Sequence, residues 1–159
     1  MKKIPLLPFL LGVLSPVPLV IMAFIMMFYS PQTTLPILLP AFVGYAAIIL
    51  SFIGGINWIL SMQKPVILLD SDMNVIDKKR LSIAVVPCLF GELAIILTAN
   101  HKWSMALLFL IIGFAVTLFL ERNSYLPTEQ PAGYQTMRWL TTFVIQLCLI
   151  GAVIFRTPW

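Results

Sequence analysis

The stretch YAAIILSFIGGINW, residues 45–58, decides the fold of this chain. It is apolar enough to cross a bilayer, yet small residues recur along it. Ala47, Ser51 and Gly55 lie at positions i, i+4 and i+8 and are predicted to share one helix face. Such a face lets a second helix approach closely in lipid, where no hydrophobic force drives association. We therefore expect this helix to be the packing centre of a bundle. The predicted helix-packing residues are Gly44, Ala47, Ser51, Gly54 and Gly55.

The composition indicates a membrane protein. Of the 159 residues, 60% are hydrophobic and 10% are charged, whereas about 25% of residues are charged in soluble domains. No charged side chain occurs between Lys3 and Lys64. That length accommodates two spanning helices of about 20 residues with a turn between them. The expected fold class is all-α, a polytopic transmembrane helix bundle.

Five helices are expected within a single integral membrane domain, residues 1–159. Pro16 and Pro18 interrupt the first of them, and each removes a backbone donor. Carbonyls freed in this way need partners from protein or water, so the break should face the bundle. It is an ordinary proline kink or, alternatively, a discontinuous helix at a transport site. The predicted helices cover about residues 4–29, 35–62, 81–99, 103–120 and 134–155.

The distribution of basic residues predicts the orientation. Lysine and arginine concentrate on the cytoplasmic side of membrane proteins, so we place the N-terminus in the cytoplasm and the C-terminus in the periplasm. No Arg- and Ser-rich transit sequence is present, which favours the bacterial inner membrane. Only Lys102 and Arg156 are then outside. The residues expected inside are Lys2, Lys3, Lys64, Lys78, Lys79, Arg80, Arg122 and Arg138.

Glu92 is the only acidic residue within a predicted span. It lies 11 residues after Leu81, which is about 16 Å along a helix and close to the middle of the bilayer. A carboxyl group there is costly, so we expect it to face the bundle interior. Two interpretations remain open. Glu92 is a functional group, such as a proton relay, ion site or lipid contact, or a protonated carboxyl that bonds a neighbouring helix.

The last helix carries a polar stripe of Arg138, Thr142 and Gln146, again at i, i+4 and i+8. We predict an intramembrane polar seam between the second, third and fifth helices. Arg138 should extend to the lipid headgroups rather than pair with Glu92. The predicted seam residues are Asn57, Glu92, Thr142 and Gln146, and the predicted headgroup residues are Lys78, Lys79, Arg80 and Arg138.

The inventory of reactive side chains is sparse. The single histidine is His101, and both cysteines, Cys88 and Cys148, lie in apolar runs. No nucleophile, zinc-binding or phosphate-binding motif occurs. We therefore expect no catalytic residues, no cofactor and no metal.

The central stretch resembles a known family. Its pattern is an aromatic residue followed by Leu-Ser-Phe-x-Gly-Gly-x-x-Trp. The chain is similar to small bacterial inner-membrane proteins that are grouped, under a domain of unknown function, with mitochondrial transmembrane protein sixty-nine. The resemblance is greatest to Acinetobacter-type members described as trimers. The matching residues are Tyr45, Leu50, Ser51, Phe52, Gly54, Gly55 and Trp58.

The resemblance implies a homotrimer with a part in envelope integrity or the lipid barrier. The favoured hypothesis is thus a non-enzymatic inner-membrane protein, homo-oligomeric, that binds phospholipid and does not bind nucleic acid. The alternative is a small transporter or channel that uses Glu92 within the membrane. A lipid-modifying enzyme is disfavoured by the sparse polar inventory.

Overall fold

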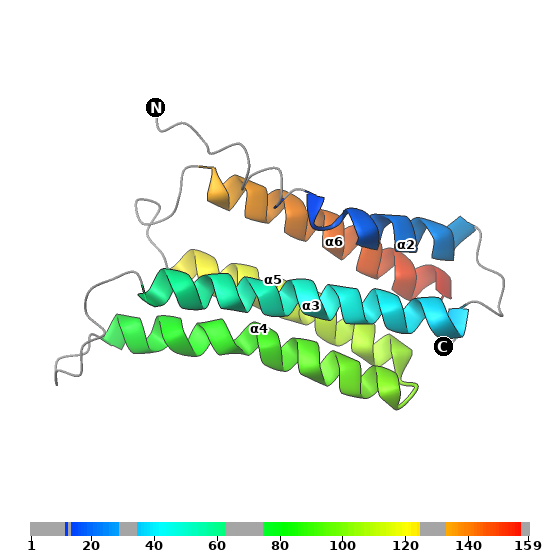
Figure 1. Ribbon diagram of the computed structural model, residues 1–159, viewed down its shortest axis with the longest axis horizontal. Helices are drawn as coiled ribbons and strands as arrows, with labels where there is room; N and C mark the ends of the chain where they lie inside the picture. Colours follow the sequence, from blue (N-terminus) through cyan, green and yellow to red (C-terminus); the bar gives the residue numbers. More distant parts are fainter. Residues whose placement is uncertain (1–11, 13, 29–34, 63–74, 125–132, 157–159) are drawn as a thin grey trace.

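The computed structural model describes residues 12, 14–28, 35–62, 75–124 and 133–156. Every element in this described part of the chain is an α-helix (Figure 1). The helices are α2 (Val17–Phe28), α3 (Leu35–Met62), α4 (Val75–Ala99), α5 (Trp103–Ser124) and α6 (Tyr134–Arg156).

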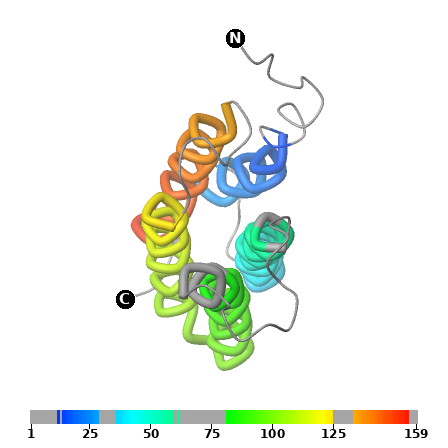
Figure 2. The backbone as a smooth tube through the Cα atoms, turned by 90° about the vertical axis from the view of Figure 1, so that its left-hand side faces the viewer, coloured from blue at the N-terminus to red at the C-terminus, as the bar shows by residue number. Residues whose placement is uncertain are grey.

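Successive helices run in alternating directions along the long axis of the molecule (Figure 1). Viewed from one end, they form a ring in the order α2, α3, α4, α5 and α6, which closes where α6 meets α2 (Figure 2). In addition, α3 contacts α5 across the ring. The helix that contains the central stretch therefore packs against α2, α4 and α5.

Four of the helices are long and apolar enough to cross a membrane, and α2 is a shorter apolar helix. This arrangement is that of a multi-pass membrane protein. The helices α2 and α6 run in the same direction and end at the same end of the molecule (Figure 1).

The first predicted helix, residues 4–29, begins outside the described residues, and its described part is α2. Two boundaries of the longer helices differ by several residues from the sequence-based prediction. The helix α4 starts at Val75, so Lys78, Lys79 and Arg80 lie within its first turns instead of in a loop. At the other boundary, α5 continues to Ser124 and includes Glu121. Charged residues suggested loops at both places. A helix can nevertheless extend beyond its apolar span, because charged residues such as lysine and arginine are good helix formers.

The proline-rich break lies where the sequence predicts it. Ser15 and Pro16 form a turn directly before α2. Pro16 has no N–H to donate to the Gly12 carbonyl, and the Ser15 hydroxyl donates to that oxygen instead, at 2.8 Å. The Tyr45 hydroxyl of α3 donates to the Ser15 carbonyl at 2.9 Å. The break therefore faces the bundle, and α3 supplies a hydrogen-bond donor to one of its carbonyl groups.

Tyr45→Phe tests this contribution. The substitution keeps the ring and removes only the donor to the Ser15 carbonyl, so we expect the free energy of unfolding to fall by about 1 kcal/mol. Unfolding in mixed detergent micelles measures it. Unchanged stability would show that the break needs no donor from α3.

The largest fully buried side chains form one continuous core. The helix α3 contributes many residues to this core, and five of its apolar residues are at most 1% exposed. These residues are Phe42, Val43, Ala46, Ala47 and Leu50. The apolar residues of the other faces, such as Phe28, Phe52 and Phe143, lie on the outer surface, as expected for a bundle with lipid around it.

Candidate functional site

The closest helix contact is between α3 and α4, and two glycines make it possible. A Cβ atom added to Gly54 would lie 2.6 Å from the Ala84 carbonyl oxygen. One added to Gly91 would lie 3.0 Å from Ser51 Oγ and 3.1 Å from the Ala47 carbonyl oxygen. The two backbones approach so closely that a Cβ atom at Gly54 would force them apart, and one at Gly91 would require its neighbours to shift.

The packing face differs in part from the predicted one. It contains Ala47, Ser51 and Gly54, whereas Gly55 is exposed. A Cβ atom on Gly55 or Gly44 would meet nothing within 4 Å. The physical reason is helix geometry: eight residues overshoot two turns by about 80°, whereas seven fall short by only about 20°. The stripe therefore continues from Ser51 to Gly54, and it packs within one chain.

A buried ion pair joins α5 to α6. Arg138 Nε and its Nη2 each donate to Glu121 Oε2 at 3.1 Å. The side chains are 6% and 0% exposed. Both charges are thus removed from solvent and from the outer surface of the bundle. A pair of this kind holds two helices in one register, because displacement would leave either charge buried alone.

The polar seam continues from this pair along the α5–α6 contact. Gln146 Nε2 donates to the Ile111 carbonyl at 2.8 Å. Between the two interactions lie Thr117 of α5 and Thr142 of α6, which are 0% and 3% exposed. The Thr117 hydroxyl donates to the Gly113 carbonyl of its own helix. Polar side chains therefore line about three turns of this interface.

Asn57 of α3 reaches the same level. The helices α3 and α5 run in the same direction (Figure 1), and a Cβ on Gly113 would lie 2.9 Å from Leu50. Asn57 follows Leu50 by seven residues and Glu121 follows Gly113 by eight, so both residues lie about 11 Å further along. Asn57 and Glu121 are both 0% exposed. Asn57 is therefore buried at about the level of Glu121, whereas the hydrogen bonds of the seam itself join α5 and α6.

The seam retains capacity for another hydrogen bond. Among the residues that the structure describes, Glu121 Oε1 and the Thr142 hydroxyl are buried and have no hydrogen-bond partner. A carboxylate oxygen accepts a hydrogen bond, and a hydroxyl group can donate or accept one. The arrangement could thus hold a water molecule beside Glu121.

These positions correct two predictions. Arg138 does not extend to the headgroups, because Glu121 holds it inside the bundle. Glu121 lies within α5, one residue beyond the end of the predicted helix 103–120. One signal could have identified it: Leu110, Phe114, Thr117 and Glu121 recur at i, i+4, i+7 and i+11, and all four are buried.

Glu92 lies on the outside of the bundle. Its side chain is exposed, and the exposed residues around it on α4 are apolar, including Leu89, Leu93 and Ile96. The prediction that Glu92 faces the interior is wrong. Gly91 faces α3, and the next residue along a helix points about 100° away. In a single chain, this carboxyl group would face lipid near mid-membrane.

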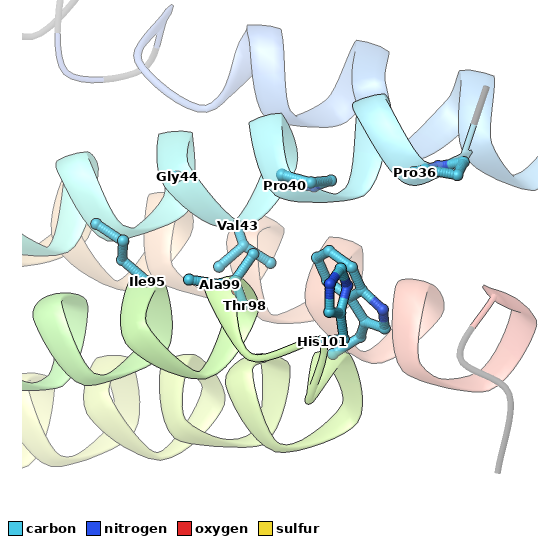
Figure 3. A pocket seen from close by; sticks show the side chains of 9 residues that line it. Pro36, Pro40, Val43, Gly44, Ile95, Thr98, Ala99 and His101 are labelled. Carbon is cyan, nitrogen blue, oxygen red and sulfur yellow. The ribbon is translucent and has the colours of Figure 1, made fainter.

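An apolar groove of about 470 Å³ lies at the other end of the bundle, between α3, the end of α4 and the start of α5 (Figure 3). Pro40 and Gly44 line it from α3, and Ile95 lines it from α4. His101 lies at its end (Figure 3), and Trp103 also lines it. The groove is separate from the polar seam, which lies where α3 and α5 end.

Comparisons with known proteins give one match. A family model described as "Protein of unknown function (DUF3429)" matches residues 4–154. No curated protein and no solved structure matches the chain.

Proposed function

The chain belongs to the DUF3429 family of proteins of unknown function, and from that premise we propose that it is a homo-oligomeric, multi-pass inner-membrane protein that binds phospholipid and catalyses no reaction. The observation that supports the oligomer is the outward position of Glu92. A carboxyl group near the centre of a bilayer is costly unless protein or water surrounds it.

A second copy of the chain is the covering that fits this surface best. Glu92 is flanked on α4 by Leu89 and Ile96, which are 53% and 49% exposed. Such a face combines apolar area with one polar group that can form a hydrogen bond across an interface. Hydrogen bonds of this type hold transmembrane helices together. Contact between copies along α4 would therefore remove Glu92 from lipid.

The wider role that we propose is support of the envelope barrier in the bacterial inner membrane. It rests on the resemblance to the trimeric Acinetobacter inner-membrane protein AciT, and the trimer is part of the same proposal. The proposed orientation keeps the N-terminus cytoplasmic. When the buried Arg138 is left out, seven of the basic residues expected in the cytoplasm remain, against two outside. This distribution still supports the proposed orientation.

Replacing Glu92 by lysine tests the oligomer. We expect native mass spectrometry of the wild-type protein in mild detergent to show an oligomer with retained phospholipid. Glu92→Lys should reduce the oligomer at least tenfold, because a bulky cation would be forced into the contact. Leu147→Lys is the matched control, since Leu147 is 55% exposed on α6 and lies 13 residues into its predicted span at a comparable depth.

Two outcomes would contradict this proposal. One is a strict monomer in the wild-type protein, and the other is equal loss of the oligomer in both lysine variants. The alternative, a transporter or channel that uses Glu92, requires a path between subunits, since Glu92 lies outside the single bundle. Proton flux into proteoliposomes that Glu92→Gln abolishes would support that alternative.

A further inference from the structure

The floor of the groove between α3 and the end of α4 is apolar. A Cβ atom on Gly44 would meet nothing within 4 Å, so this position opens the groove instead of packing against α4. Ile95 and Ala99 line the opposite side. The hydroxyl of Thr98 donates to the Ala94 carbonyl within its own helix, so it adds little polarity. The groove therefore suits a hydrocarbon chain.

The rim of the groove is a tightly constrained turn. The N–H of His101 donates to the Thr98 carbonyl and that of Lys102 to the Leu97 carbonyl, which is the hydrogen-bond pattern of a Schellman motif. His101 has a φ of 57°, where glycine is the usual residue. Non-glycine residues in this conformation are concentrated at functional sites. The imidazole packs edge-on against Trp103, with ring centroids 5.6 Å apart.

The depth of this turn matches the lipid headgroups. It connects the apolar spans Leu81–Ala99 and Trp103–Ser124, so it lies at a membrane face. Tryptophan is typical of that level. His101 and Lys102 are both exposed there. A lysine at this depth attracts phosphate, and an imidazole N–H can donate a hydrogen bond to it. From this rim, the groove extends about 12 Å along α3, the rise from Pro36 to Gly44.

We propose that the groove holds one acyl chain of an anionic phospholipid whose phosphate contacts His101 and Lys102. The apolar floor and the cationic rim match the two parts of such a molecule. This inference rests on the phospholipid binding of the proposed function, and it names the site and the lipid class. The occupant comes from the leaflet at the end of the molecule where α4 meets α5.

Native mass spectrometry of the full chain tests the proposed phospholipid site. The protein is supplied with phosphatidylglycerol or with phosphatidylcholine of identical acyl chains. The wild-type protein should retain phosphatidylglycerol several-fold more than phosphatidylcholine. Lys102→Gln should remove that preference. Gly44→Leu, which fills the groove, should reduce retention of both lipids at least tenfold.

Two variants separate loss of lipid from loss of fold. Gly55→Leu is the matched control, because it also meets nothing within 4 Å and lies outside the groove lining; it should retain lipid as the wild-type protein does. His101→Gly relaxes the left-handed backbone, so it should remain folded and lose the preference for phosphatidylglycerol.

Three results would overturn the site. They are undiminished retention in Gly44→Leu, equal loss in Gly55→Leu, and equal retention of the two lipids by the wild-type protein. If Gly44→Leu instead converts an oligomer to a monomer without changing lipid retention, a second copy occupies the groove and the proposal also fails. The same spectra report subunit number. A monomer that keeps phosphatidylglycerol would contradict the oligomer and leave the lipid site intact.

Discussion

Arg138→Leu is expected to lower the free energy of unfolding by about 3–5 kcal/mol, the usual cost of removing one partner of a buried ion pair. The reason is the position of Glu121, which is 0% exposed and accepts two hydrogen bonds from Arg138 on one oxygen. Without the guanidinium group, the carboxylate stays buried without a countercharge or must take up a proton. Unfolding in mixed detergent micelles measures the loss.

A double-mutant cycle identifies the ion pair as the cause. Glu121→Leu combined with Arg138→Leu should recover much of the stability, because no charge then remains unpaired. Arg122→Leu is the matched control, since Arg122 is the exposed neighbour of Glu121 on α5 and should have little effect. Additive losses in the double variant would show that the two side chains do not depend on each other.

Gly54→Ala and Gly55→Ala are expected to have opposite effects. A Cβ on Gly54 would lie 2.6 Å from the Ala84 carbonyl oxygen, which is backbone, so α3 and α4 must separate. Such overpacking costs about 1–3 kcal/mol or more. Gly55 faces open space, and there alanine gains up to about 1 kcal/mol of helix propensity.

The adjacent glycines form an internal control, because both substitutions add the same methyl group to the same helix. Unfolding in mixed micelles should therefore show Gly54→Ala to be less stable than the wild-type protein and Gly55→Ala at least as stable. Equal stability of the two variants would contradict the close approach of α3 to α4. Gly54→Leu should prevent that approach altogether and leave little folded protein.

Local patterns were sufficient for some features of the site. Pro16 predicts the break before α2, since a missing N–H is a property of the residue itself. Ala47 and Ser51 mark the face that meets α4, because small residues four apart share a helix face. The sequence predicts that both Gly54 and Gly55 pack against a neighbouring helix. Only Gly54 does so, because the direction from which α4 approaches decides which of the two is covered.

Other features depend on pairs of residues far apart in the chain. Nothing near Glu121 in the sequence indicates Arg138, which is 17 residues away and lies on another helix. Similarly, nothing near Glu92 tells which face of α4 is covered. Hydrophobic periodicity is weak on a helix that is apolar all round, because lipid and core favour the same side chains.

The sequence by itself therefore determined that this is an all-helical membrane protein, where the four long helices lie to within about six residues, and that small residues set the contact between α3 and α4. Bilayer thickness and helix geometry impose these features on any chain with such long apolar runs. The tertiary structure alone decided which polar groups meet. It paired Arg138 with Glu121, turned Glu92 outward and opened the groove at Gly44, because each outcome depends on how neighbouring helices rotate against one another.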